Sequence, residues 1–222
     1  FKYFLLFYNN YLYICDIILK QIIMKLIGKN SVSKYFSYFF YFLFIIFTLI
    51  GLYEILGFSV ILYNEKTGSH FLSQTFYISQ DVGWSNNFYT EKLKDLMKFR
   101  MNIPFTETQL YTGIYNLHSA FNILSTFFYL SFFTYSLYRI LKELTKEIIF
   151  SKEVILWLKR LAYLNLLYIP LHIFKNFIFK DFAFGDAIYT SFYMLIIGCS
   201  ILFVIALFKK GYELQSENDL TI

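Results

Sequence analysis

Charged side chains are scarce in this sequence. Only 16% of the 222 residues are Asp, Glu, Lys or Arg, against about 25% in soluble proteins, while 58% are hydrophobic. This composition excludes an ordinary soluble globule and predicts an integral membrane protein. The net charge of +5 is ordinary for such a protein and gives no reason to expect direct nucleic-acid binding.

Cysteine is almost absent, and so are the sequence motifs of catalysis. Cys15 lies near the start and Cys199 inside an apolar run, so no disulfide framework exists and Cys199 is best interpreted as a packing residue. No Ser-His-Asp order, phosphate-binding Gly-rich loop or dinucleotide fingerprint occurs. We therefore expect a protein that is not an enzyme, with no catalytic residues and no cofactor.

Long uncharged runs are what the sequence has instead. Ala187 to Phe208 contains no charge, and as a helix these residues measure about 33 Å, enough to cross about 30 Å of hydrocarbon. Similar runs predict four membrane-spanning helices, at residues 35–63, 117–138, 161–179 and 187–208. The third requires Lys175 to extend its ammonium toward the interface, and Pro170 predicts a kink in it.

Basic residues predict how the chain is oriented. Three precede the first span from Lys25 onward, six lie between spans two and three, and two follow span four, which makes eleven on one side. The other side has seven, and five of those lie in a loop that also contains five acids. By the positive-inside rule, this predicts a multi-pass protein of the cell inner (cytoplasmic) membrane with both termini in the cytoplasm.

The first 23 residues contain no run long enough to span and no small-residue cleavage site. We expect translation to start at Met24, which makes residues 1–23 an upstream or non-native extension. Residues 24–222 are then expected to form a single four-helix membrane domain.

The loop at residues 64–112 is the only sizeable element predicted outside the membrane. Phe71–Gln80 has a strand-like composition and Asp81–Gly83 is typical of a turn. Thr90 is expected to cap a helix that ends before Pro104, with one face formed by Leu93, Leu96, Met97 and Arg100. The expected fold class is thus an all-α membrane protein of four transmembrane helices, with a mixed outer loop between helices 1 and 2. We interpret this loop as an ordinary cap, with ligand sensing as the alternative.

On the cytoplasmic side, the pattern from Ile140 to Ile149 predicts that span two continues as an amphipathic helix. Phe150 and Ser151 then interrupt it, and Ser151 is a candidate N-cap for the next helix. Such a helical hairpin would lie against lipid headgroups, where its basic residues meet anionic lipid without a specific partner.

Ionisable residues within the spans are candidates for a binding site, because burying them in a membrane is costly. Glu54, His118 and His172 are all predicted near the outer ends of their helices. A carboxylate and two imidazoles are suitable for zinc or for proton relay, which gives the alternative of a small transporter or ion-binding bundle. Because helix ends collect polar residues anyway and no His-x-x-x-His or Cys-x-x-Cys spacing occurs, we expect no metal site.

The cytoplasmic tail, residues 209–222, combines acidic and apolar side chains. These are typical of a segment that docks a basic cytosolic protein; the alternative is a solvated acidic tail that ends the last helix at Gly211. The candidate docking residues are Glu213, Leu214, Glu217, Asn218, Asp219, Leu220, Thr221 and Ile222.

The same tail carries a family resemblance, together with Phe150, Ser151 and the Lys159–Arg160 pair. The tail residues involved are Phe208, Lys209, Lys210, Gly211, Glu213, Leu214, Glu217, Asn218, Asp219, Leu220, Thr221 and Ile222. From about Phe36 to Ile222 the chain resembles the bacterial membrane family called domain of unknown function 2975. The resemblance implies a four-span bundle that is often encoded beside a small Cro-like helix-turn-helix regulator, and it brings no catalytic residues.

These observations favour a non-enzymatic membrane protein with a signalling or regulatory role through its cytoplasmic tail. Its expected partners are the lipid bilayer and a small cytosolic helix-turn-helix regulator. The alternative remains the transporter or ion-binding bundle that uses Glu54, His118 and His172.

Overall fold

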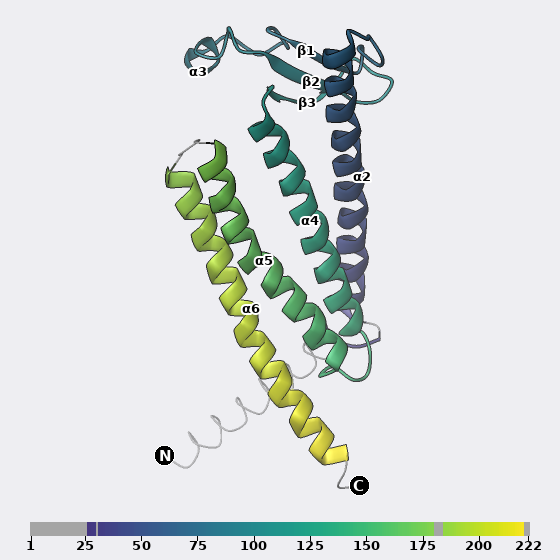
Figure 1. The fold of residues 1–222 in the computed structure, drawn as a ribbon. Coiled ribbons are helices and arrows are strands. Elements are labelled where there is room, and N and C mark those ends of the chain that lie inside the picture. The colour runs from purple at the N-terminus through teal and green to yellow at the C-terminus, as the bar shows by residue number, and fades with distance from the viewer. Residues whose placement is uncertain (1–25, 30, 180–183, 220–222) are drawn as a thin grey trace, which may run out of the picture. The chain divides into compact units, whose positions relative to one another are not determined.

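The computed structural model describes residues 26–29, 31–179 and 184–219, with the backbone alone at residues 179, 184–187 and 219. The expected extension at residues 1–23, and Leu220, Thr221 and Ile222 of the tail, therefore lie outside the described residues. The order of elements is α2 (Val32–Thr67), β1 (Phe76–Ser79), α3 (Phe88–Glu91), β2 (Lys98–Asn102), β3 (Gln109–Ile114), α4 (Leu117–Glu143), α5 (Lys152–Phe179) and α6 (Phe184–Asp219) (Figure 1).

Four of these helices, α2, α4, α5 and α6, are long and apolar enough to cross a membrane. A three-stranded sheet lies in the sequence between α2 and α4, so the predicted fold class is confirmed. α2 and α6 each contain 36 residues and measure about 54 Å, well beyond the roughly 30 Å of hydrocarbon. The helices extend past the predicted spans because polar residues at the ends of a helix can continue it in water.

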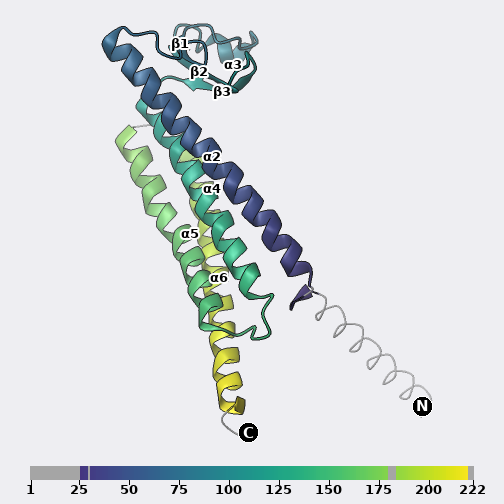
Figure 2. The same cartoon turned by 90° about the vertical axis from the view of Figure 1, so that its right-hand side faces the viewer.

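The described contacts group the chain into two compact units. In the first, residues 1–44 and 132–222, helices α5 and α6 lie side by side (Figures 1 and 2). Gly198 of α6 permits this close approach, because a Cβ there would lie 2.7 Å from Leu166 of α5. The buried core of this unit is formed by Ile140, Val154, Ile155, Trp157, Leu158, Leu161, Ala162 and Ile205.

The second unit, residues 45–131, contains the sheet, whose order is β1-β2-β3 with antiparallel neighbours. Phe99 and Met101 of the central strand are fully buried and pack with Phe58 and Ile61 of α2. The C-terminal part of α2 therefore packs on the sheet and is also part of a span. The predicted strand at Phe71–Gln80 is present in its second half as β1.

The helix predicted from Thr90 to Pro104 is wrong. α3 contains only four residues, and its N-cap is Asn87, whose side chain accepts from the backbone N–H of Thr90. Residues 98–102 form strand β2 instead. The polar and apolar side chains of β2 alternate with period two, and burial of Phe99 and Met101 outweighs the helical spacing of the residues before them.

Two cations of β2 hold the loops around the sheet. The Lys98 ammonium is buried and donates to the carbonyls of Gln80, Lys94 and Leu96 at 2.7, 3.2 and 3.0 Å. Arg100 donates in the same way to the carbonyls of Val82 and Glu107. Backbone carbonyls thus take the place of a carboxylate as the partners of both charges.

The helical connection predicted on the other side is shorter than expected. α4 ends at Glu143 rather than near Ile149, and the chain then turns, with the Leu144 carbonyl accepting a hydrogen bond from the Gly28 N–H. The Ser151 hydroxyl accepts from the Val154 N–H, which confirms the predicted N-cap of α5. α5 continues as a helix through Pro170.

Replacing Lys98 by Met should detach the loop at residues 80–97 from the sheet, because methionine fills a similar volume but donates to none of the three carbonyls. We expect a loss of about 1.5–3 kcal/mol in the free energy of unfolding. Amide hydrogen exchange in residues 80–97 should rise at the same time. Lys94→Met, at an exposed position in the same loop, is the matched control; equal effects of both variants would contradict the prediction.

Candidate functional site

Three of the residues that carry the family resemblance, Phe150, Phe208 and Gly211, meet where α6 passes the start of α5. The ring of Phe150 lies edge-to-face with Phe208, with 5.3 Å between ring centroids. A Cβ at Gly211 would lie only 2.6 Å from Cδ1 of Phe150. The Lys152 ammonium lies 5.8 Å from the Tyr212 ring centroid. This joint, formed by Phe150, Lys152, Phe208, Gly211 and Tyr212, holds the C-terminal part of α6 against the α4–α5 connection.

Gly211 does not end the last helix, so the helix end expected there in the solvated-tail alternative is wrong. α6 continues through it to Asp219, and its final turns extend past the start of α5 (Figures 1 and 2). Glycine is needed here for close contact with the Phe150 ring, not for a left-handed turn. The eleven residues 209–219 continue the helix for about 16 Å beyond the uncharged run.

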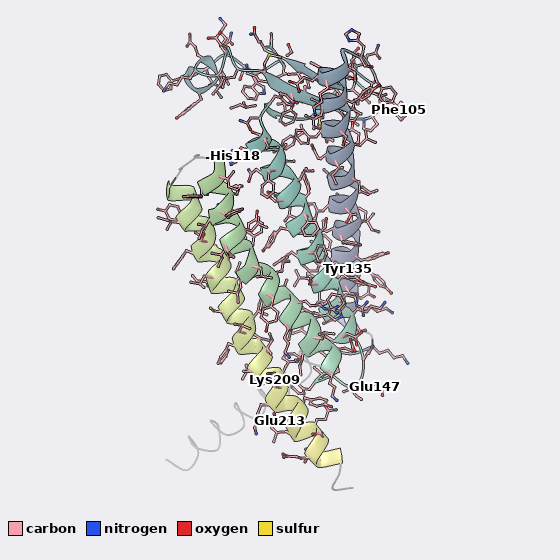
Figure 3. All side chains as sticks on the ribbon, viewed as in Figure 1. Phe105, His118, Tyr135, Glu147, Lys209 and Glu213 are labelled. Atoms are coloured by element: carbon pink, nitrogen blue, oxygen red, sulfur yellow. The ribbon has the colours of Figure 1, made fainter. Side chains whose placement is uncertain are left out.

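The predicted docking residues lie on this helical extension, and Figure 3 labels Lys209 and Glu213 on it. Glu213, Leu214, Glu217 and Asn218 are exposed. Glu213 lies 3.6 Å from the Lys210 ammonium, a solvent-exposed ion pair that contributes little to stability. Asp219 is the last residue of α6, and its side chain is not described.

Sequence reasoning missed a cluster of cations and aromatic rings on α4 and α5. The guanidinium carbons of Arg139 and Arg160 lie 4.8 and 4.3 Å from the ring centroid of Trp157, and Tyr135 packs edge-on against the same indole. The available signal was a tryptophan two residues before the Lys159–Arg160 pair, at the boundary of an apolar run. Trp157 itself is buried in the core between α5 and its neighbours.

The ionisable residues predicted at the outer helix ends do not form a ligand set. Glu54 is fully buried in α2, and neither carboxylate oxygen has a hydrogen-bond partner among the described residues. His118 begins α4 in the same unit, whereas His172 lies on α5 and stacks with Tyr168. Within the described ranges, no group of three or more His, Cys, Asp or Glu side chains is placed to hold a metal ion.

A small cavity of about 180 Å³ lies beside the C-terminal end of α2. Glu65 and His70 line it together with Asn64, Ser69, Ser73 and several apolar residues. The Tyr115 hydroxyl donates to Glu65 at 2.6 Å, and burial, then this bond and the charge of Glu65, raise the pKa of Tyr115. The cavity is smaller than the usual range for drug-sized ligands, about 300–1,000 Å³.

Four long apolar helices define the chain as a multi-pass membrane protein in contact with the lipid bilayer. The chain belongs to the family described as "Protein of unknown function (DUF2975)", whose family model matches residues 89–222. The match begins in the outer loop, so α2 lies outside it, although the resemblance was expected from about Phe36. No curated protein and no solved structure matches the chain.

The contact between Gly211 and Phe150 predicts that Gly211→Ala changes the stability of the protein in opposite directions with and without the Phe150 ring. Gly211→Ala should destabilise the protein, because the added methyl displaces the Phe150 ring. In a Phe150→Ala background, the same change should stabilise it by up to about 1 kcal/mol, the usual advantage of Ala over Gly inside a helix. Thermal unfolding of the four variants in detergent measures the double-mutant cycle. The same effect in both backgrounds would contradict the predicted contact between residue 211 and the Phe150 ring.

Proposed function

We propose that this protein is a non-enzymatic regulatory membrane protein that captures a cytosolic partner on the helical extension of α6, residues 209–219. The observation that supports this proposal is the form of the tail. It is a continuous helix that presents Glu213 and Leu214 to solvent and is held in place by Phe150. A preformed helix loses less conformational entropy on binding than a flexible acidic tail would.

The charge distribution supports a cytoplasmic position for this extension. Eleven basic residues precede span one, separate spans two and three or follow span four, against seven on the other side. Under the positive-inside rule both termini are cytoplasmic, in the inner membrane of a bacterium. The sheet of residues 76–114 is then outside.

The chemistry of the extension specifies the kind of partner. Glu213 and Glu217 are four residues apart and share one helix face, with Leu214 beside them as an apolar contact. Such a surface is complementary to a basic protein with a small apolar patch. Helix-turn-helix regulators have basic DNA-binding surfaces, and the family resemblance implies that such a regulator is often encoded nearby.

We expect Glu213→Gln combined with Glu217→Gln to weaken binding of the helix-turn-helix regulator encoded nearby. The loss should be at least tenfold, about 1.4 kcal/mol. Both proteins are purified, the full chain is placed in nanodiscs, and the Kd is measured at low and high salt. The matched control is Glu147→Gln with Glu153→Gln, which removes two exposed charges outside the extension. Equal Kd values for the two double variants would refute the docking site.

The helical form of the extension is tested separately. Leu214→Pro keeps both acids but breaks the helix after Gly211. We expect a loss of affinity comparable to that of the charge variant, with circular dichroism showing the remaining helices intact. Wild-type affinity in Leu214→Pro would show that the charges act without the helix.

The second candidate function is an ion-binding or transporting bundle, and the buried carboxyl group of Glu54 favours it. An ionised carboxylate without a partner is costly to bury, so a residue of this type inside a helix is a candidate binding group. If this function holds, Glu54→Gln abolishes ion uptake into proteoliposomes while deletion of residues 213–222 leaves uptake unchanged. If the docking function holds, Glu54→Gln leaves partner binding unchanged and deletion of residues 213–222 abolishes it.

A further inference from the structure

The cluster of Arg139, Trp157 and Arg160 places two positive charges close together. Both guanidinium carbons lie within 5 Å of one indole centroid, so they are at most about 9 Å apart. Arg139 is on α4 and Arg160 on α5, so the pair is assembled by packing between helices and not by neighbouring positions in the sequence. Two like charges at this distance repel unless an anion lies near them.

The protein supplies no such anion in the part of the chain that the structure describes. Neither arginine has an ion pair among the described residues, whereas Glu143 pairs with Lys146 at 2.5 Å. Glu143, one helical turn after Arg139, is therefore already occupied by a lysine. The Nε atom of Arg139 is buried without a hydrogen-bond partner, and its Nη1 lies 3.5 Å from the Tyr135 hydroxyl.

The position along both helices is that of a membrane interface. Arg139 directly follows the uncharged residues 117–138, except for His118, and Arg160 directly precedes the apolar run from Leu161. Trp157 and Tyr135 are of the residue types enriched at the level of the headgroups. Arg160 is exposed, so this cluster is accessible from outside the packed core.

We propose that Arg139, Arg160 and the Trp157 ring form a binding site for the phosphate group of an anionic phospholipid. Guanidinium groups bind phosphate with two parallel N–H donors, and two of them on adjacent helices can contact one headgroup. The buried indole holds both guanidiniums in place, and the exposed Arg160 makes the site accessible to the headgroup. The site ties α4 and α5 to one lipid and differs from general attraction to a charged surface.

Lipid binding is tested on the delipidated full chain in detergent, by native mass spectrometry with phosphatidylglycerol, phosphatidylcholine or inorganic phosphate as the probe. We expect one phosphatidylglycerol to bind at least tenfold more tightly than phosphatidylcholine. In Arg139→Gln with Arg160→Gln this preference should fall at least tenfold. Inorganic phosphate that binds as tightly as phosphatidylglycerol would overturn a lipid as the ligand.

The matched control is Lys209→Gln with Lys210→Gln, which removes the same charge from the same side of the membrane. It should keep the preference for phosphatidylglycerol within about twofold. If both double variants lose affinity equally, binding depends on total charge and the site is overturned. If the arginine variant loses its helical circular dichroism, Arg160→Gln alone replaces it, because that side chain is exposed.

Tryptophan fluorescence tests where the lipid binds. Trp84 and Trp157 are the two tryptophans of the chain. Trp84→Phe keeps a ring for the nearby Lys98 ammonium, 5.5 Å from its centroid, and leaves Trp157 as the single indole. The emission of Trp157 should change saturably with phosphatidylglycerol, and Arg139→Lys with Arg160→Lys should weaken the response. Binding of phosphatidylglycerol without any change in emission would place the lipid elsewhere.

Discussion

The backbone N–H and C=O groups of a segment that crosses hydrocarbon have to find partners within the protein, because no water is available there. This constraint accounts for α2, α4, α5 and α6 and for the small number of polar residues in them. It applies only over about 30 Å, and two of the helices measure about 54 Å. The helix residues beyond those 30 Å form the two features described above, the contact of α2 with the sheet and the helical extension of α6. The C-terminal part of α2 packs on the sheet, and the C-terminal end of α6 forms the helical extension.

Close approaches between elements depend on glycine in both units. Gly57 lets the Phe76 and Met101 side chains reach the backbone of α2, and Gly198 and Gly211 do the same for Leu166 and Phe150 along α6. A glycine inside a helix is usually unfavourable by about 1 kcal/mol relative to alanine. Here the loss is offset by aromatic, thioether and aliphatic contacts that a Cβ would block.

The membrane helices could be predicted because an uncharged run long enough to span is a one-dimensional signal, as in residues 187–208. The cap was harder to predict, because the strand conformation of β2 depends on packing against neighbouring elements. Phe99 and Met101 become buried only when α2 and the other strands are present, whereas the spacing of Leu93, Leu96 and Met97 before them suits a helix. The cluster at Trp157 was missed for a similar reason. Arg139 and Arg160 are 21 positions apart, and only packing brings them to one ring. By contrast, Ser151 was a correct N-cap because capping depends on residues within one turn.

The contact of the sheet with α2 has a consequence for biogenesis. Phe76, Phe99 and Met101 are covered by Phe58 and Ile61, which belong to a membrane-spanning helix and not to the loop itself. The segment between α2 and α4 is therefore not a self-contained domain that can fold before its flanking helices are inserted. Until α2 is in place, the apolar face of the sheet has nothing to pack on, so maturation of the sheet reports on correct insertion of α2.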